Sequence, residues 1–536
     1  MRKNLLALSI AAMVGGLSGV ANAQAVGADT VGARQIGNSG PALAALVTAG
    51  AVKAPGAAGI PAAATTLKQA TTGVGHILLV PYFSTQGTHA TLLNLVNTDQ
   101  VNGKAVKLRF RGAANSDDLF DITIFLSPGD AWTANVSADG DLSALTTNDT
   151  SCTLPSASDI KAAGGKFSTR RVMDNSPAQT REGYVEILNM ADIPAGSALY
   201  TATKHATVDG VWKAPCTPAV MAQQTTPLSV IDSANYPSTR GYSWPTGGLM
   251  ANWTLVDVAT KASYSGEAVA LRAAANSNVP DSAGAANIVF SPQTPDTVAI
   301  ADAVSLTADP LLRTGAVLAA NYDFPDLSTP YTGAILLPAA QANELSDALA
   351  AFSISNEYVT DPSVLFATDW VFSMPTRRYA VAVNYGPENK TAALVSNPDV
   401  VKYFSASSNV TLGSDKKLCV KAGMTGQNSA LVPFDREEKS GGTSFVISPG
   451  APQELIFCGE TSVLTFNGKP SILGAKLVTQ NITTGFTDGW VNVKTPGLGN
   501  GLPVVGYAVA KAIGPDGGNF GGTWVHRTNK VLGQPF

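Results

Sequence analysis

The chain has 536 residues, of which 45% are hydrophobic and only 14% are charged, and its net charge is −4. This acidic balance argues against a nucleic-acid partner, because nucleic-acid binding needs a basic surface. The length predicts more than one domain, and the 51 glycines and 32 prolines are typical of short strands joined by turns rather than of a helical protein.

Residues 1–23 have the pattern of a secretory signal peptide. Two basic residues follow the first methionine, residues 5–20 are apolar, and residues 21–23 (Ala-Asn-Ala) fit the small-x-small cleavage pattern. We therefore expect cleavage after Ala23 and export of the rest of the chain. A membrane span is the alternative, although the apolar part is short for one.

Residues 24–72 are dominated by Ala, Gly, Thr and Val and carry few charges. This composition predicts a flexible arm. A functional alternative is an arm that adds a strand to the sheet of a neighbouring copy.

The first β domain is predicted over residues 73–280. Within residues 105–111, apolar side chains alternate with Lys107, Arg109 and Arg111, as they do in a strand that buries one face. We interpret these three basic residues as a solvated strand face. Further strand signals lie at residues 120–126, 131–136, 184–190, 198–207, 252–258 and 268–272.

The second β domain is predicted over residues 281–536. One helix is expected from Pro338, because Leu345, Leu349 and Phe352 then share a face. Strand signals occur at residues 316–321, 334–337, 370–374, 379–385, 418–421, 444–447, 454–458 and 462–466. The chain is thus predicted to be all-β, with two consecutive antiparallel β-sandwich domains of Ig-like or jelly-roll type, long loops and little helix.

Four cysteines, an even number, indicate disulfides in an exported chain. Pairing Cys152 with Cys216 and Cys419 with Cys458 keeps each bridge within one half of the chain, although three connectivities are possible. A zinc site is disfavoured, because no C-x2-C spacing occurs and the four histidines are scattered.

Catalytic signatures are missing from the sequence. It contains no G-x-S-x-G, H-E-x-x-H or P-loop motif. His89 and His205 could act as general bases, but no nucleophile is identified beside them. The charged residues 435–438 are better interpreted as an ion-pair cluster or a solvated loop, and Arg377 and Arg378 could pair with such acids. We therefore expect no catalytic residue.

An oxygen-rich stretch is a candidate calcium site. Asp139, Asp141 and Ser143 place oxygen ligands at alternate positions, and Asp149 follows. The stretch lacks the glycine and the final glutamate of an EF-hand loop. Ca²⁺ is the one cofactor that the sequence suggests, and an ordinary solvated turn is the alternative.

Four tryptophans support a different class of function. Trp132, Trp212, Trp244 and Trp490 could form a platform on which sugars stack, or they could be packed in cores and loops.

Several short sequence segments resemble segments of exported proteins of Gram-negative bacteria, most of which are uncharacterised. They are Thr180 to Glu186, Thr368 to Val371, Pro375 to Arg378, Asp435 to Glu438 and Gly501 to Tyr507. This resemblance implies export and all-β architecture and adds no catalytic residue. In composition the chain also resembles bacterial surface-layer subunits, which are exported, acidic, β-rich and poor in Cys and Met.

The leading hypothesis is an exported, non-enzymatic structural protein of the cell surface. It would associate with itself as a homo-oligomer or lattice on the cell envelope, as a surface-layer or extracellular matrix subunit. The alternatives are a secreted carbohydrate-binding or polymer-degrading protein and an outer-membrane β-barrel.

Overall fold

The computed structural model describes residues 64–169, 172, 174–225, 241–275, 286, 338–384, 391–394, 403–404, 410–412, 418–421, 431–440, 455–495, 501–514 and 517–531. The predicted signal peptide, most of the predicted arm and the predicted domain boundary near residue 280 lie outside these ranges. So do the strand signals at residues 316–321, 334–337 and 444–447.

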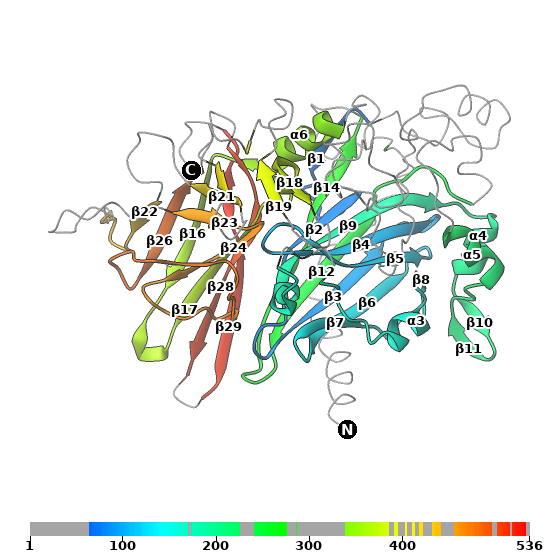
Figure 1. The fold of residues 1–536 in the computed structure, drawn as a ribbon, viewed down its shortest axis with the longest axis horizontal. Coiled ribbons are helices and arrows are strands. Elements are labelled where there is room, and N and C mark those ends of the chain that lie inside the picture. The colour runs from blue at the N-terminus through cyan, green and yellow to red at the C-terminus, as the bar shows by residue number, and fades with distance from the viewer. Residues whose placement is uncertain are drawn as a thin grey trace.

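The first half of the chain forms two antiparallel sheets (Figure 1). The larger sheet has seven strands, in the order β1 (Thr66–Gln69), β14 (Val269–Ala274), β2 (Ile77–Ser84), β9 (Glu182–Ile193), β4 (Gly103–Gly112), β5 (Asp118–Leu126) and β8 (Cys152–Leu154). The smaller sheet has five strands, in the order β13 (Ala262–Glu267), β12 (Leu249–Asp257), β3 (His89–Asn97), β6 (Ala131–Asp139) and β7 (Leu142–Thr146). One apolar cluster joins their facing surfaces.

Helices cover part of the seven-stranded sheet. Its second apolar cluster contains Ile77 and Leu271 from strands together with Leu199 and Leu345 from helices. The helical and hairpin elements around this sheet are α3 (Ala157–Ala162), η1 (Pro177–Arg181), α4 (Ala198–Thr203), β10 (Ala206–Val208), β11 (Val211–Lys213), α5 (Pro218–Thr225) and α6 (Pro338–Leu349).

The second half forms another pair of sheets. Four strands lie in the order β22 (Leu431–Phe434), β26 (Asp488–Lys494), β16 (Ser353–Val359) and β30 (Arg527–Asn529). Five lie in the order β25 (Thr479–Ile482), β24 (Thr461–Phe466), β17 (Ala367–Ser373), β28 (Val505–Ile513) and β29 (Asn519–Val525). Only the pair β24 and β25 is parallel among the strand pairs that the structure describes.

Smaller elements complete this half. They are the sheet of β20 (Val410–Leu412), β21 (Leu418–Lys421) and β23 (Ile456–Cys458), the pairs β15 (Ala350–Ala351) with β27 (Leu502–Pro503) and β18 (Val381–Asn384) with β19 (Thr391–Leu394), and the short helices η5 (Pro362–Val364) and η6 (Arg377–Ala380).

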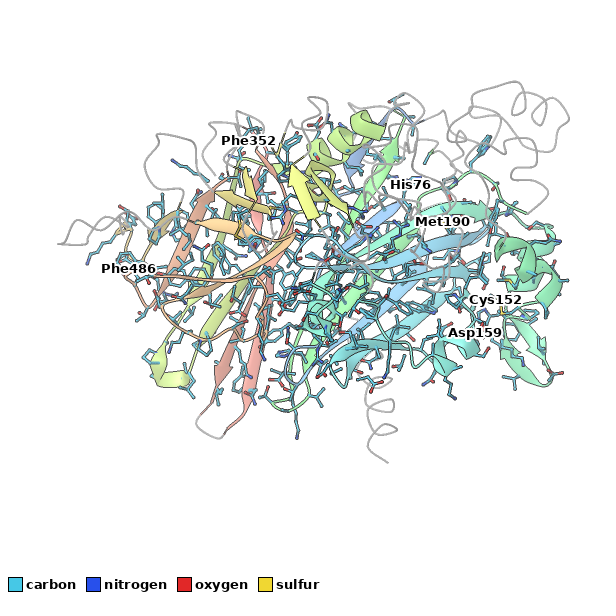
Figure 2. The ribbon with its side chains drawn as sticks, viewed as in Figure 1. His76, Cys152, Asp159, Met190, Phe352 and Phe486 are labelled. Atoms are coloured by element: carbon cyan, nitrogen blue, oxygen red, sulfur yellow. A yellow bond between two sulfur atoms is a disulfide. The ribbon has the colours of Figure 1, made fainter. Side chains whose placement is uncertain are left out.

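The central strands of the five-stranded sheet of the second half are buried on both faces. Trp370 and Phe372 belong to the core of the second half. The alternate residue Val371 and its cross-strand partner Tyr507 belong instead to the core of the first half, where Tyr507 stacks on Trp253 at 4.4 Å between ring centroids. Side chains of the two halves therefore fill one continuous space (Figure 2).

The structure confirms the predicted all-β, sandwich-type fold with little helix. The helix expected from Pro338 is α6, and it ends at Leu349, before Phe352. The strand predicted at residues 198–207 is wrong over its first part, which is α4, because Ser197 caps a helix by accepting a hydrogen bond from the backbone N–H of Tyr200.

The end of the predicted arm contains a strand. Residues 66–69 form β1 and pair with β14 of the same chain. No helix within the described ranges is long and apolar enough to cross a membrane.

The shared core predicts that Trp253 stabilises both halves together. Trp253→Ala removes a buried ring and its stack on Tyr507, so we expect the free energy of unfolding to fall by about 3–5 kcal/mol in one cooperative transition. Trp212→Ala is the matched control, because Trp212 is 68% exposed and should change stability by less than about 0.5 kcal/mol. Urea unfolding followed by circular dichroism checks both. Two separate transitions, of which Trp253→Ala moves only one, would contradict a shared core.

Candidate functional site

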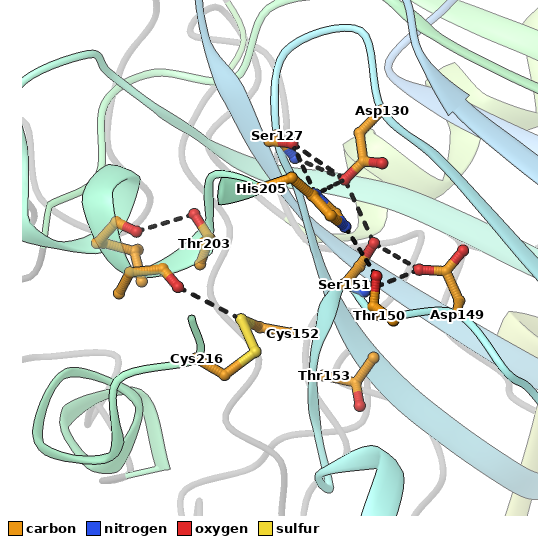
Figure 3. The surroundings of a disulfide bond; sticks show 12 residues. Ser127, Asp130, Asp149, Thr150, Ser151, Cys152, Thr153, Thr203, His205 and Cys216 are labelled. Atoms are coloured by element: carbon orange, nitrogen blue, oxygen red, sulfur yellow. Dashed lines mark hydrogen bonds and ion pairs between the residues drawn. A yellow bond between two sulfur atoms is a disulfide. The ribbon is translucent and has the colours of Figure 1, made fainter. Parts of the chain in front are cut away.

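Both disulfides follow the local pairing preferred from the sequence. Cys152 joins Cys216 with a Cα–Cα distance of 5.4 Å, and Cys419 joins its cross-strand partner Cys458 at 4.1 Å. The first bridge ties β8 to the segment between β11 and α5 (Figure 3). Disulfides persist in oxidising compartments, which agrees with an exported protein.

A carboxylate, an imidazole and a hydroxyl meet at His205, near this bridge (Figure 3). The imidazole Nδ1 lies 3.5 Å from Asp130 Oδ2 and 3.3 Å from Ser127 Oγ. Its Nε2 lies 3.1 Å from Thr150 Oγ1. This order of groups is the one that nucleophilic catalysis uses.

The other contacts of Asp130 favour a structural role for His205. Asp130 Oδ2 also accepts hydrogen bonds from the backbone N–H and the Oγ of Ser127 and from Ser151 Oγ. The carboxylate thus holds the turn between β5 and β6 and links it to the segment before β8. His205 extends the same tie to Thr150.

Turn geometry accounts for part of the predicted calcium site. Asp139 ends β6, Leu142 begins β7, and Gly140 between them has a φ of 62°, so the stretch is a tight hairpin turn. Asp139 and Asp141 are exposed on it, and Asp139 lies 3.6 Å from Lys166 Nζ.

The other two predicted calcium ligands lie in local hydrogen bonds. Ser143 is buried and its Oγ donates to the carbonyl of Thr180, while Asp149 accepts from the N–H and Oγ of Ser151. In the described part of the chain, no three His, Cys, Asp or Glu side chains are grouped so that they could hold a metal ion. The calcium site stays a prediction.

The solvated basic face predicted for β4 is wrong. Lys107, Arg109 and Arg111 are all buried, Lys107 pairs with Asp121, and Arg111 Nε lies 3.1 Å from Glu186 Oε2. The alternation identified the strand correctly. It could not show that other parts of the chain cover the second face of the sheet.

Residues of the second half of the chain cover part of the β4 face that carries the basic residues. Arg378 Nη1 lies 3.6 Å from Glu186 Oε1, and Arg377 Nη2 donates to the carbonyl of Ala114 at 3.3 Å. Within the second half, Arg377 Nε lies 3.7 Å from Glu460 Oε2. The acids that pair with these two arginines are therefore not residues 435–438, which form an exposed turn. We call Arg109, Arg111, Glu186, Arg377, Arg378 and Glu460 the interface cluster.

Backbone contacts cross the same boundary. Glu182 Oε1 accepts hydrogen bonds from the N–H groups of Lys476 and Leu477 at 2.7 and 3.2 Å. The N–H of Thr461 donates to the carbonyl of Ala113 at 3.1 Å. These bonds fix the position of one half on the other, because each needs both partners in register.

Burial raises the pKa of two carboxyl groups at this boundary. It raises the pKa of Glu460 to about 7, against the opposing charges of Arg377 and Arg378. Burial also raises the pKa of Asp369 on β17 to about 7, although Ser471 Oγ and the N–H of Leu473 donate to its Oδ2. The second oxygen of Asp369 has no hydrogen-bond partner.

The tryptophans do not form one platform. Trp132 and Trp244 are buried, whereas Trp212 is exposed on the β10–β11 hairpin. Trp490 is partly exposed and stacks on Phe434 of the neighbouring strand with a centroid distance of 4.2 Å and an interplanar angle of 8°.

The edge strand β29 carries the candidate functional surface, which the sequence analysis missed. Phe520, Trp524 and Val525 are 63%, 45% and 72% exposed. The first two share a face, and only β28 pairs with β29 among the described strands (Figure 1). Strand β13 of the first half packs beside the start of β29, where Asn519 Nδ2 donates to the carbonyl of Thr260 at 2.8 Å. We call Phe520, Trp524 and Val525 the β29 surface. Two glycines between them, at positions 521 and 522, weakened the strand signal.

Comparison with protein-family models, with curated proteins and with solved structures gave no match.

The unusual carboxyl at Asp369 predicts a pH-dependent stability. Burial raises its pKa to about 7 in the folded protein, against an ordinary value of 3.8, so the unfolded chain ionises first and stability falls as pH rises from about 4 to about 7. Asp369→Asn keeps the shape and cannot ionise. We expect the variant to gain up to about 4 kcal/mol over the wild type between these two pH values.

Urea unfolding at pH 4.5 and pH 8, compared between the two proteins, measures this difference. A variant that is equally stable relative to wild type at both values would show that Asp369 ionises as an ordinary carboxyl does.

Proposed function

We propose that the protein is an exported, non-enzymatic structural protein of the cell surface that associates with itself through strand β29. The β29 surface is the observation that carries this proposal. It places exposed apolar side chains on an edge strand whose ladder partner among the described strands is β28. Strand β13 packs beside the start of β29, near Asn519 and Gly521, so we place the added strand along the part that carries Trp524 and Val525.

The other edge strands of the described large sheets are shorter. With seven residues, β29 is the longest of them, and it contains no charged residue and no proline. By contrast, β1 carries Lys68, β22 carries Pro433 and β30 carries Arg527. Charged residues and prolines are the means by which edge strands avoid pairing with other chains, and β29 lacks them.

A second copy of the same chain fits this edge best. The β29 strand of one copy can lie antiparallel to that of another across a two-fold axis, so that each apolar surface meets its own equivalent. Such pairing closes a dimer, and a lattice needs a further contact.

Location and chemistry support the same proposal. The signal-like start, the two disulfides and the resemblance to exported proteins of Gram-negative bacteria favour the cell surface. The contacts of His205, which explain its position without catalysis, favour a protein that is not an enzyme.

Lysine substitutions on β29 distinguish specific association through the β29 surface from non-specific hydrophobic association. Phe520→Lys combined with Trp524→Lys puts like charges against each other in the paired state, and we expect association to weaken at least about tenfold. Val211→Lys combined with Trp212→Lys is the matched control, since these residues are 55% and 68% exposed on the β10–β11 hairpin. Sedimentation velocity over a range of concentrations gives the dissociation constants, and thermal melting verifies that both variants fold.

Equal weakening by the two double variants would exclude β29 as the contact. A wild-type protein that stays monomeric at its highest soluble concentration but is retained by a polysaccharide would favour the carbohydrate-binding alternative. The partly exposed Trp490 beside Phe434 would then be the stacking surface.

A further inference from the structure

A fully buried lysine lies between two buried aspartates in the first half. Lys104 on β4 has no exposed side-chain area, and its Nζ lies 2.8 Å from Asp192 Oδ1 and 2.9 Å from Asp99 Oδ2. Asp192 on β9 is the direct cross-strand partner of Lys104. Amine and carboxyl groups of two strands are thus held together where water is excluded.

The two aspartates have different surroundings. Burial, with the nearby charge of Asp99, raises the pKa of Asp192 against the effect of Lys104. For Asp99, burial is outweighed by Lys104 and by the N–H groups of Asn102 and Val101, so its pKa is lowered. One carboxyl is therefore suited to hold a proton and the other to stay ionised, which is the division that acid–base chemistry needs.

Hydrogen-bond donors surround the carboxyl of Asp192. Its Oδ1 accepts from Asn189 Nδ2 and from the backbone N–H of Thr246, both at 3.1 Å. Its Oδ2 accepts from Thr246 Oγ1 at 2.5 Å. Donors in this arrangement stabilise the negative oxygen that forms when a nucleophile attacks a carboxyl carbon.

We propose that Lys104 and Asp192 join in an intramolecular amide bond, with Asp99 as the proton carrier. A proton passes from the Lys104 ammonium to Asp192 Oδ2 through Thr246 Oγ1, which is hydrogen-bonded to both groups, and this gives a neutral amine and a neutral acid. The Lys104 Nζ then attacks Asp192 Cγ, a C–N bond forms, and the charge on Oδ1 is held by Asn189 and the Thr246 N–H.

The step balances without any other reactant. Asp99 accepts the proton that the attacking nitrogen loses and delivers it to Oδ2, the Cγ–Oδ2 bond breaks, and one water leaves. Nothing is oxidised or reduced. The product is a covalent link between β4 and β9, two neighbouring strands of the seven-stranded sheet.

Mass spectrometry of the purified, exported protein under denaturing conditions tests this directly. We expect the wild-type chain to be lighter than its two-disulfide form by one water, about 18 Da. Proteolysis should release a branched peptide in which Lys104 is bound to Asp192, and this peptide should survive reduction. A wild-type mass that lacks only the four hydrogens of the disulfides overturns the proposal, whatever the variants do.

Single substitutions distinguish the proposed roles of Lys104, Asp192 and Asp99. Lys104→Met should restore the lost mass, while Lys107→Met, which alters the other buried lysine of β4, should leave the link intact. Asp192→Asn should still react but lose ammonia, about 17 Da, instead of water. Asp99→Asn should leave most of the chain unlinked, and unchanged linkage in that variant would overturn the role of Asp99.

Discussion

The structure depends on the central strands of one sheet, which are buried on both of their faces. In an ordinary sandwich one face of each sheet meets water, but β17 and β28 send Trp370 and Ala508 into one core and Val371 and Tyr507 into another. The two halves of the chain therefore meet through buried apolar side chains. The same arrangement brings β29, the neighbour of β28, beside β13 of the first half, where Asn519 Nδ2 donates to the carbonyl of Thr260 at 2.8 Å.

The interface cluster fixes the relative placement of the two halves, which the non-directional apolar contact alone does not. Burying an ion pair costs desolvation energy that the pairing only partly offsets, so the cluster is a weak source of stability. Its value lies in geometry, because removing one partner leaves a buried charge and because Arg378 reaches Glu186 in only one relative placement of the halves. Glu182 acts in the same way, with hydrogen bonds from two consecutive backbone N–H groups of the other half.

Local patterns predicted much of the fold. Alternation located β4, β5, β6 and β12, the Pro338 signal located α6, and proximity in sequence chose the disulfide partners. What failed depends on residues far apart in the chain. Arg109 lies opposite Glu186 on a strand that follows much later, so its burial has no local signal.

The candidate site was harder to predict than the fold. Acidic residues of the β6–β7 turn suggested calcium because hairpin turns and oxygen ligands favour the same residue types. The β29 surface escaped notice for the opposite reason, since glycines interrupt the alternation that marks a strand. Exposure of an edge strand is a property of the whole sheet, and strand order cannot be read from one segment.

Hydrogen–deuterium exchange of the native protein at high and at low concentration tests the central claim most directly. A rigid two-half body that pairs through β29 predicts amides of β29 that gain protection only at high concentration. The same account predicts that amides of β17, β28, β2 and β9 stay equally protected at both concentrations, because they open only when the whole body unfolds. Unchanged exchange in β29, or one half exchanging while the other stays protected, would contradict it.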